Sequence, residues 1–178
     1  QPHMTDHEEK TMGPARFLVE HLDLLPRGRA LDIAMGYGRN AVFLARAGFE
    51  VEGVDISPEA AAGALKAAKE AGVNLAVCVA DLEDGYVIEQ GAYDLIICFN
   101  YLHRPLIPEI KKGLHPSGMV VYETFIVDQA RFGRPRNRDH LLEHNELLDM
   151  FRDFRCLRYH EGLMDTRRAV AGIIAEKL

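Results

Sequence analysis

The chain has 178 residues, of which 48% are hydrophobic and 27% charged, and its formal net charge is −6. These values are typical of a soluble globular protein with a full core, so we expect residues 1–178 to form a single domain. An acidic chain offers no broad basic face for nucleic acid, and no apolar run is long enough to cross a membrane, so neither partner is expected.

The N-terminal region, residues 5–28, is expected to contribute a leading helix. Residues 1–3 look like a cloning remnant, which makes Met4 the expected natural start, and no signal peptide opens the chain, so a cytoplasmic location is the default. Apolar residues at helical spacing between positions 11 and 25 predict a helix that covers the sheet. These apolar residues are Phe17, Leu18, Leu22 and Leu25.

Residues 29–55 have the pattern of a strand, a glycine turn, a helix and a second strand. The first strand is expected over 30–34, Gly36 and Gly38 permit the turn, and the second strand, over 49–54, stops at Asp55. Glycines let the backbone approach a ligand, and a helix start leaves N–H groups free to donate. An acid after the second strand can accept hydrogen bonds from both hydroxyls of a ribose, so the unit predicts a nucleotide site.

The glycine spacing differs from that of dinucleotide-binding proteins. From Ala34 the pattern is Ala-x-Gly-x-Gly, and Asn40 and Ala41 stand where a third glycine would allow close packing. Asp32, just before the glycines, would repel a pyrophosphate but suits an ammonium or sulfonium group. The alternative is an ordinary α/β unit whose glycines serve only to turn the chain.

The chain from residue 57 to residue 123 continues the alternation of helices and strands. Ser57 is a predicted N-cap and Gly72 a predicted C-cap. The expected elements are a helix over 58–71, strands over 74–79, 93–99 and 119–123, and a short helix over 106–114. Because ligands bind beyond the carboxyl ends of parallel strands, the hexapeptide 100–105 is a candidate site segment.

The segment 126–140 carries four arginines within eight residues, at positions 131, 134, 136 and 138. It follows the fifth strand, so we expect it to overhang the pocket, where Arg131 and Arg134 would bind an anionic substrate or the segment would act as a lid. The alternative is a solvated loop whose arginines pair with neighbouring acids.

Residues 140–144 match the H-x-x-E-H pattern of a zinc peptidase helix, but no third ligand is evident, so no metal site is expected. Four apolar residues predict that the same helix packs on the core: Leu141, Leu147, Leu148 and Phe151. Two final strands are expected over 154–159 and 169–176. Cys78, Cys98 and Cys156 form no C-x-x-C pair and are expected to be reduced thiols in the core.

The run from Asp32 to Gly38 resembles motif I of the class I S-adenosylmethionine-dependent methyltransferases, with Ala34 in place of the first glycine. Within that family the chain is similar to small bacterial tellurite-resistance methyltransferases. The shared features are the short leading helix and the segments Gly36–Asn40, Glu146-Leu147 and Tyr159-x-Glu161. The resemblance implies an α/β fold with a Rossmann-like, doubly wound seven-stranded sheet in the order 3-2-1-4-5-7-6, strand 7 being antiparallel.

The resemblance also implies residue roles. Asp55 would hold the ribose, Asp81 the adenine, and the glycine corner the methionyl end of S-adenosylmethionine. The expected cofactor-binding residues are Asp32, Ala34, Gly36, Gly38, Arg39, Asn40, Asp55, Ile56, Asp81, Leu82, Asn100 and Tyr101. The expected acceptor-binding residues are Tyr101, His103, Arg104, Arg131 and Arg134. Tyr101 would place its ring against the sulfonium, a cation–π contact.

The function implied is methyl transfer from S-adenosylmethionine to a small-molecule acceptor, with a sulfur, selenium or tellurium nucleophile as one possibility. A soft nucleophile that is already ionised needs no protein base, so none is assigned. The alternatives are a non-catalytic module that binds S-adenosylmethionine or S-adenosylhomocysteine, and an NAD-dependent oxidoreductase, which the glycine spacing and Asp32 disfavour. Neither the identity of the acceptor nor the oligomeric state follows from the residues.

Overall fold

The computed structural model describes residues 12–178, so the expected cloning remnant and the start at Met4 lie outside the described residues. The strands are β1 (Arg29–Ile33), β2 (Glu50–Asp55), β3 (Ala76–Val79), β4 (Tyr93–Phe99), β5 (Leu114–Phe125), β6 (Arg155–Asp165) and β7 (Arg168–Glu176). The α-helices are α2 (Arg16–Glu20), α3 (Arg39–Arg46), α4 (Pro58–Ala71), α5 (Leu106–Gly113) and α6 (Glu146–Met150). Three short 3₁₀ helices are η1 (Leu22–Leu24), η2 (Val127–Arg131) and η3 (Arg138–His140).

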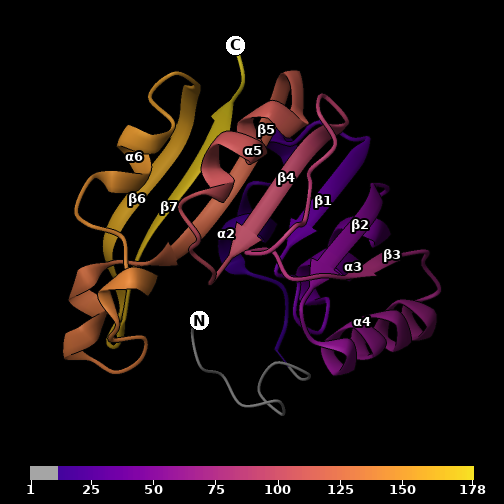
Figure 1. Ribbon diagram of the computed structural model, residues 1–178, viewed down its shortest axis with the longest axis horizontal. Helices are drawn as coiled ribbons and strands as arrows, with labels where there is room; N and C mark the ends of the chain where they lie inside the picture. The colour runs from indigo at the N-terminus through magenta and orange to yellow at the C-terminus, as the bar shows by residue number, and fades with distance from the viewer. Residues whose placement is uncertain (1–11) are drawn as a thin grey trace.

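The strands form one seven-stranded sheet in the order β3-β2-β1-β4-β5-β7-β6 (Figure 1). The first five strands pair in parallel, and β7 runs antiparallel to both β5 and β6. The order and the antiparallel strand predicted from the sequence are therefore confirmed. Because parallel strands end at the same edge of a sheet, the residues that follow β1, β2 and β4 meet at one edge.

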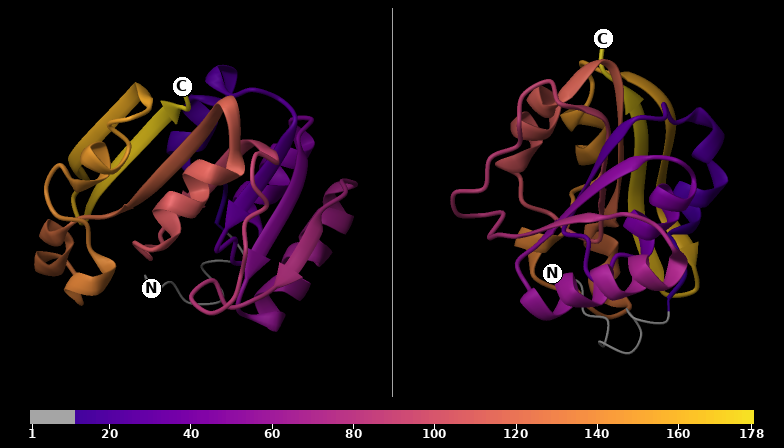
Figure 2. Two further views of the ribbon diagram at one scale, coloured as in Figure 1. Left: turned by 45° about the horizontal axis from the view of Figure 1, so that its top comes forward. Right: turned by 90° about the vertical axis from the view of Figure 1, so that its right-hand side faces the viewer.

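Side chains along the central strand β4 alternate between the two faces of the sheet, as the pleat requires. Ile96 and Cys98 belong to the core beneath α5 and α6, whereas Leu95 and Ile97 belong to the core beneath α2 and α3. The right-hand panel of Figure 2 shows these two layers of helices on opposite sides of the sheet. Burial on both faces explains why the β4 sequence is a continuous apolar run.

The predicted caps of α4 are confirmed. The Ser57 hydroxyl oxygen accepts a hydrogen bond from the Ala60 N–H at 3.1 Å, and Gly72 ends the helix in a left-handed conformation with φ 71°. These caps satisfy backbone groups that the helix itself leaves unpaired. They fix where the chain turns back from α4 toward β3.

The predicted leading helix is shorter than expected. It divides into the five-residue α2 and the 3₁₀ helix η1, because His21 leaves the helical region with φ −116° and ψ 15°. The His21 ring nitrogen Nδ1 lies 2.9 Å from the carbonyl oxygen of Phe17. Phe17 and Leu18 are nevertheless buried, so the covering role predicted for this segment is confirmed.

The predicted helix around residues 140–151 is wrong in its first half. Leu142 instead bridges Ile126 in parallel pairing, and Asn145 has φ 67°, so α6 begins only at residue 146. His140 and His144 therefore do not share a helix, and the residues the structure describes contain no group of three or more His, Cys, Asp or Glu suited to a metal ion. Leu148 is 38% exposed rather than part of the core.

Two of the three cysteines are not core thiols. Cys98 in the central strand is buried, but Cys78 and Cys156 are exposed. The reason is position, because β3 and β6 are the two edge strands of the sheet. Among residues 12–178, no helix is both long and apolar enough to cross a membrane.

Candidate functional site

The turn between β1 and α3 passes through three residues with positive φ: Ala34 at 56°, Gly36 at 58° and Gly38 at 84°. Residues with a Cβ pay about 1–2 kcal/mol for this left-handed conformation, which glycine adopts freely. A Cβ on Gly38 would in addition lie 2.8 Å from the Cβ of Ala64 in α4. Small residues are thus required both for the shape of this corner and for the approach of α4.

Asp55, the last residue of β2, is tied to the glycine corner. Its Oδ2 accepts a hydrogen bond from the Gly36 N–H at 2.9 Å, and its Oδ1 accepts one from the Ser57 N–H at 2.9 Å. These two bonds fix the carboxylate at the carboxyl edge of the sheet, where each oxygen keeps a further lone pair for a ligand hydroxyl. Ile56 follows with 52% of its surface exposed.

Asp32 in β1 is 2% exposed, and its Oδ2 has no hydrogen-bond partner among the described residues. Burial raises the pKa of Asp32 to about 8; the positive charge of Arg39 opposes this shift, and the negative charge of Asp55 adds to it. A buried polar atom without a partner costs free energy, so this carboxyl is suited to a cationic ligand that supplies both a donor and a charge.

Asn100 follows β4 and presents a second buried oxygen without a partner in the described part of the chain, its Oδ1. Its backbone is held with φ 59°, and its N–H donates to the carbonyl of Glu123 at 2.9 Å. β1 and β4 are neighbouring strands in which Asp32 pairs with Ile97, so Asn100 lies three residues further along, just past the end of β4. The structure thus brings these two predicted cofactor residues to the same edge.

Tyr101 is 4% exposed and donates its hydroxyl proton to Glu83 at 3.0 Å. Burial together with this hydrogen bond raises the pKa of Tyr101 well above its ordinary value, so the phenol stays neutral. Leu82 is 7% exposed and belongs to the same core cluster. Asp81 is exposed, and one of its oxygens accepts from the Glu83 N–H at 2.9 Å, which leaves the other available to a ligand.

Two residues of the glycine-corner helix hold the leading segment. Asn40 is 4% exposed, and its side-chain oxygen accepts from the Ala15 N–H at 2.8 Å. Arg39 donates to the carbonyl of Gly13 at 3.1 Å. These contacts place the leading segment beside the corner, and they give Asn40 a structural bond that the sequence did not indicate.

His103 and Arg104 make contacts to acidic residues. Nδ1 of His103 lies 3.7 Å from a carboxylate oxygen of Glu83. Arg104 donates to both carboxylate oxygens of Glu146, at 2.6 and 2.9 Å, and to the carbonyl of Leu141 at 2.9 Å. Arg104 therefore holds α6 against the segment after β4. The sequence predicted that Arg104 would bind the acceptor and did not indicate this structural contact.

A cleft of about 790 Å³ lies between α2, the ends of β4 and β5, and the β6–β7 hairpin. Arg39 and Asn100 line one part of it, so it adjoins the glycine corner. Glu123, His160 and Arg168 line another part, and the Glu123 carboxylate is hydrogen-bonded to both of the other side chains. No local sequence pattern indicated this group, because His160 and Arg168 are 37 and 45 residues away from Glu123 in the chain.

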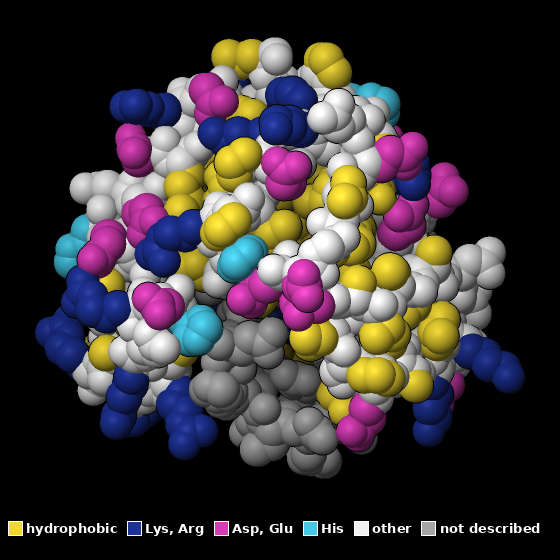
Figure 3. Space-filling model, viewed as in Figure 1, with side chains coloured by type: hydrophobic (Ala, Val, Ile, Leu, Met, Phe, Trp, Pro, Cys, Tyr) yellow, Lys and Arg dark blue, Asp and Glu magenta, His cyan; other side chains and the backbone are white. Residues whose placement is uncertain are grey.

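The arginine-rich segment 126–140 contributes unequally to the cleft. Arg134 is among its lining residues, whereas Arg131 is 72% exposed in its side chain and pairs with Asp128 at 3.2 Å. Figure 3 shows Lys and Arg side chains gathered at the lower left, over the region of this segment. The structure thus brings Arg134 to the cleft and leaves Arg131 in a surface ion pair.

Comparison with known proteins adds three findings. A family model described as "Methyltransferase domain" matches residues 30–118. The chain is 30% identical over 147 residues to a protein named hemagglutinin 1 from Eikenella corrodens, covering 76% of this chain and 47% of the relative. It is 29% identical over 150 residues to a glycine/sarcosine N-methyltransferase from Halorhodospira halochloris, covering 79% of this chain and 52% of the relative.

Among solved structures, the fold is similar to that of TehB from Haemophilus influenzae, with a TM-score of 0.80 and 21% identity. The match covers 97% of this chain and 66% of the TehB chain. The sequence of TehB carries the name probable S-adenosyl-L-methionine-dependent methyltransferase. The present chain spans about half the length of these curated relatives.

Proposed function

The chain belongs to the methyltransferase-domain family, and from this premise we propose that it transfers the methyl group of S-adenosylmethionine to a small-molecule acceptor. We further propose that residues 1–178 form one domain and act in the cytoplasm. The acceptor we favour is a chalcogen nucleophile, in which sulfur, selenium or tellurium receives the methyl group.

The observation that carries the cofactor assignment is the buried Oδ2 of Asp32, which has no partner in residues 12–178. It lies beside a corner whose left-handed residues leave the backbone open to close approach. A dinucleotide would bring a negatively charged pyrophosphate to this corner, whereas S-adenosylmethionine carries an ammonium and a sulfonium. The buried carboxyl oxygen and the open backbone of the corner therefore fit S-adenosylmethionine better than a dinucleotide.

Each remaining part of the cofactor has a matching group at the edge of the sheet. Asp55 would accept from the ribose hydroxyls, Asp81 from the adenine amino group, and Asn100 from the methionyl end through its unpartnered Oδ1. Arg39 would pair with the cofactor carboxylate. When bound, S-adenosylmethionine supplies a methyl group already activated by the positive sulfur, so the chain has to bind, orient and exclude water.

Two observations support a small, anionic chalcogen acceptor. The cleft beside the corner is lined by arginines, among them Arg134, Arg167 and Arg168. Its volume of about 790 Å³ suits a small molecule. The resemblance of the chain to tellurite-resistance methyltransferases adds a reason to prefer a soft nucleophile.

Isothermal titration calorimetry with S-adenosylmethionine, S-adenosylhomocysteine and NAD tests the cofactor. We expect both adenosyl ligands to bind, NAD not to bind, and Asp55→Ala to abolish binding, with the exposed Asp23→Asn as a matched control. Binding of NAD alone would overturn the assignment. A mass-spectrometric screen of thiol, selenide and tellurite acceptors then tests transfer, and cofactor binding without transfer to any of them would favour a sensor of the cofactor over an enzyme.

A further inference from the structure

Phe99, Glu123, Gly172 and His160 lie in one row across β4, β5, β7 and β6. Nε2 of His160 lies 2.7 Å from Oε2 of Glu123, although their strands are separated by β7. Gly172 makes this reach possible, because a Cβ at that position would lie 2.5 Å from Nε2 of His160. A histidine on an edge strand thus crosses a glycine to reach a carboxylate that is 3% exposed.

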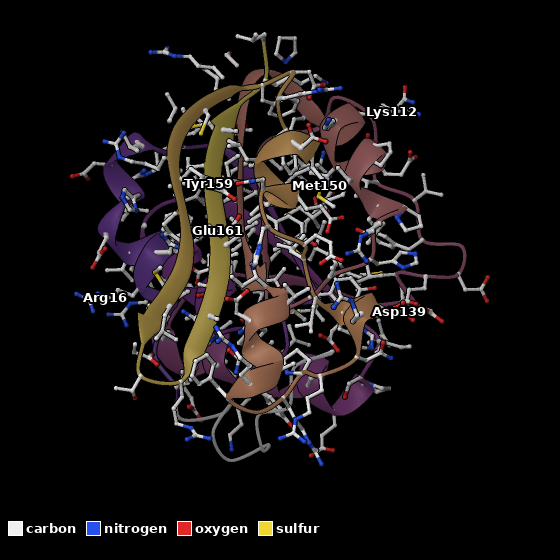
Figure 4. All side chains as sticks on the ribbon, turned by 90° about the vertical axis from the view of Figure 1, so that its left-hand side faces the viewer. Arg16, Lys112, Asp139, Met150, Tyr159 and Glu161 are labelled. Carbon is white, nitrogen blue, oxygen red and sulfur yellow. The ribbon has the colours of Figure 1, made fainter. Side chains whose placement is uncertain are left out.

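The His160 ring faces the cleft side of the sheet. Figure 4 shows Tyr159 and Glu161, its neighbours in β6, on the side of the strand where α6 lies, and the Tyr159 side chain packs against the core beneath that helix. Because side chains alternate along a strand, His160 faces α2 instead. There the Phe17 ring packs on it with centroids 4.5 Å apart and planes inclined at 60°.

The partners of Glu123 determine which ring nitrogen carries the proton. Burial favours the neutral carboxyl, but hydrogen bonds from His160 and Arg168 outweigh it and hold the pKa of Glu123 below its usual value. An ionised carboxylate only accepts hydrogen bonds, so Nε2 of His160 must donate. Nδ1 of the neutral ring then carries a lone pair, and no group in residues 12–178 bonds to it.

Several other ionisable groups surround the ring. Those on the elements packed around it are Glu123 of β5, Arg168 of β7, Arg16 and Glu20 of α2, His21 just after α2, and Arg39 of α3, all of which line the same cleft. Glu123 is already balanced by Arg168 at 2.8 Å, and Arg16 pairs with Glu20. The carboxylate that the ring contacts is therefore also paired with an arginine.

We propose that His160 accepts the proton of the methyl acceptor, so that the acceptor enters the site with a protonated nucleophile such as a thiol. Glu123 acts as the positioning residue that fixes the ring and its tautomer, the arrangement expected of a general base held by a carboxylate. The inference rests on the proposed function and narrows its substrate class. It also differs from an acceptor that is already ionised, which would not need His160.

The position of the ring agrees with this role, because His160 and Asn100 line the same cleft of about 790 Å³. Asn100 follows β4, and the ring lies over β7, two strands away, which is a separation of about 10 Å at the usual strand spacing. In the transfer, the acceptor sulfur forms a bond to the methyl carbon, the bond from that carbon to the cofactor sulfur breaks with its electron pair remaining on the cofactor sulfur, and the S–H proton moves to Nδ1 of His160.

Nitrogen-15 NMR of the imidazole groups tests the tautomer in the intact chain, with the His160 signals identified by their loss in His160→Gln. We expect the neutral ring to carry its proton on Nε2, and Glu123→Gln to reduce that preference. A proton on Nδ1, or a ring that stays doubly protonated up to pH 9, would overturn the proposal because no lone pair would be available. This result decides the point even where no acceptor is turned over.

A transfer assay adds a chemical readout with two probes. Mercaptoacetate carries a thiol that is largely protonated at pH 7, whereas hydrogen selenide is already ionised. We expect His160→Gln to lower kcat/KM for mercaptoacetate about 100-fold and to leave that for selenide within a few-fold, since general-base catalysis contributes about 10²–10⁴. Glu123→Gln should show the same split, whereas the exposed His115→Gln should change neither.

Calorimetry with S-adenosylhomocysteine separates this inference from the proposed function. If His160→Gln binds S-adenosylhomocysteine with unchanged affinity and loses kcat/KM for mercaptoacetate, proton transfer to His160 is supported. An equal loss for both probes would show that His160 only shapes the cleft. Absence of cofactor binding in the wild-type chain would instead refute the proposed function and leave the tautomer measurement unaffected.

Discussion

Replacing Asp32 by Asn should stabilise the free protein while it weakens cofactor binding. Burial raises the pKa of Asp32 from 3.8 to about 8, so between these values the folded chain retains a proton that the unfolded chain releases. Wild-type stability therefore falls as the pH rises from about 4 to 8. At about 1.4 kcal/mol for each pH unit, ionisation of the unfolded chain costs the wild type up to about 4 kcal/mol at pH 7, and the neutral amide of the variant removes this cost.

Urea unfolding of wild type and Asp32→Asn at pH 5 and pH 7 measures this effect, because every other ionisation cancels in the difference between the two proteins. We expect the stability advantage of the variant to be about 2–3 kcal/mol larger at pH 7 than at pH 5. The exposed Asp23→Asn should show no such change. An advantage that is independent of pH, or that shrinks as the pH rises, would refute the reasoning.

The affinity of the wild type for S-adenosylmethionine should rise with pH, whereas its stability falls. A cationic ligand needs the ionised carboxylate, so the wild type should release a proton on binding S-adenosylmethionine, and its affinity should rise about tenfold between pH 6 and pH 7. Calorimetry in two buffers of different ionisation enthalpy counts that proton. Asp32→Asn should bind more weakly and without proton release; release of a proton by the variant would assign the effect to another group.

Three further predictions concern the corner, α6 and the cleft. Gly38→Ala should lower the free energy of unfolding by about 1–3 kcal/mol and weaken binding of S-adenosylhomocysteine, because the new Cβ meets Ala64 at a positive φ; unchanged thermal unfolding would contradict this. Arg104→Met should lower the melting temperature by removing the ion pair with Glu146, yet leave the calorimetric affinity for S-adenosylhomocysteine unchanged; weaker binding would return Arg104 to the ligand site. Arg134→Ala should raise KM for mercaptoacetate with little change in kcat; an unchanged KM would separate this arginine from the acceptor.

The strand order and the shape of the glycine corner were predictable because their signals are local. A stretch of only 20 residues contains the signals for the turn: the spacing of Gly36 and Gly38, and Asp55 at the end of an apolar run. The continuous apolar run of β4 identified a central strand by the same logic. Burial at the edge strands was not predictable in this way, since Cys78 lies in an apolar run whose outer side has no neighbouring strand.

The side-chain contacts of the proposed acceptor side could not be predicted, because they join residues that are distant in the sequence. Arg104 and Glu146 are 42 residues apart, and His160 and Glu123 are 37 apart. Each residue alone is an ordinary polar position in a strand or loop. The one available signal was weak: Gly172 interrupts the apolar run of β7, and a glycine inside a strand often marks the close approach of another group.

The antiparallel course of β7 has a consequence for how the site can change. It brings Arg168, the first residue of the last strand, to the edge where β1, β2 and β4 end, so residues distant in the chain line one cleft there. The family match at residues 30–118 ends before Glu123 and therefore does not include Glu123, His160 and Arg168. Under the proposed function, substitutions in the last third of the chain would change the methyl recipient and leave unchanged the residues proposed to bind the methyl donor.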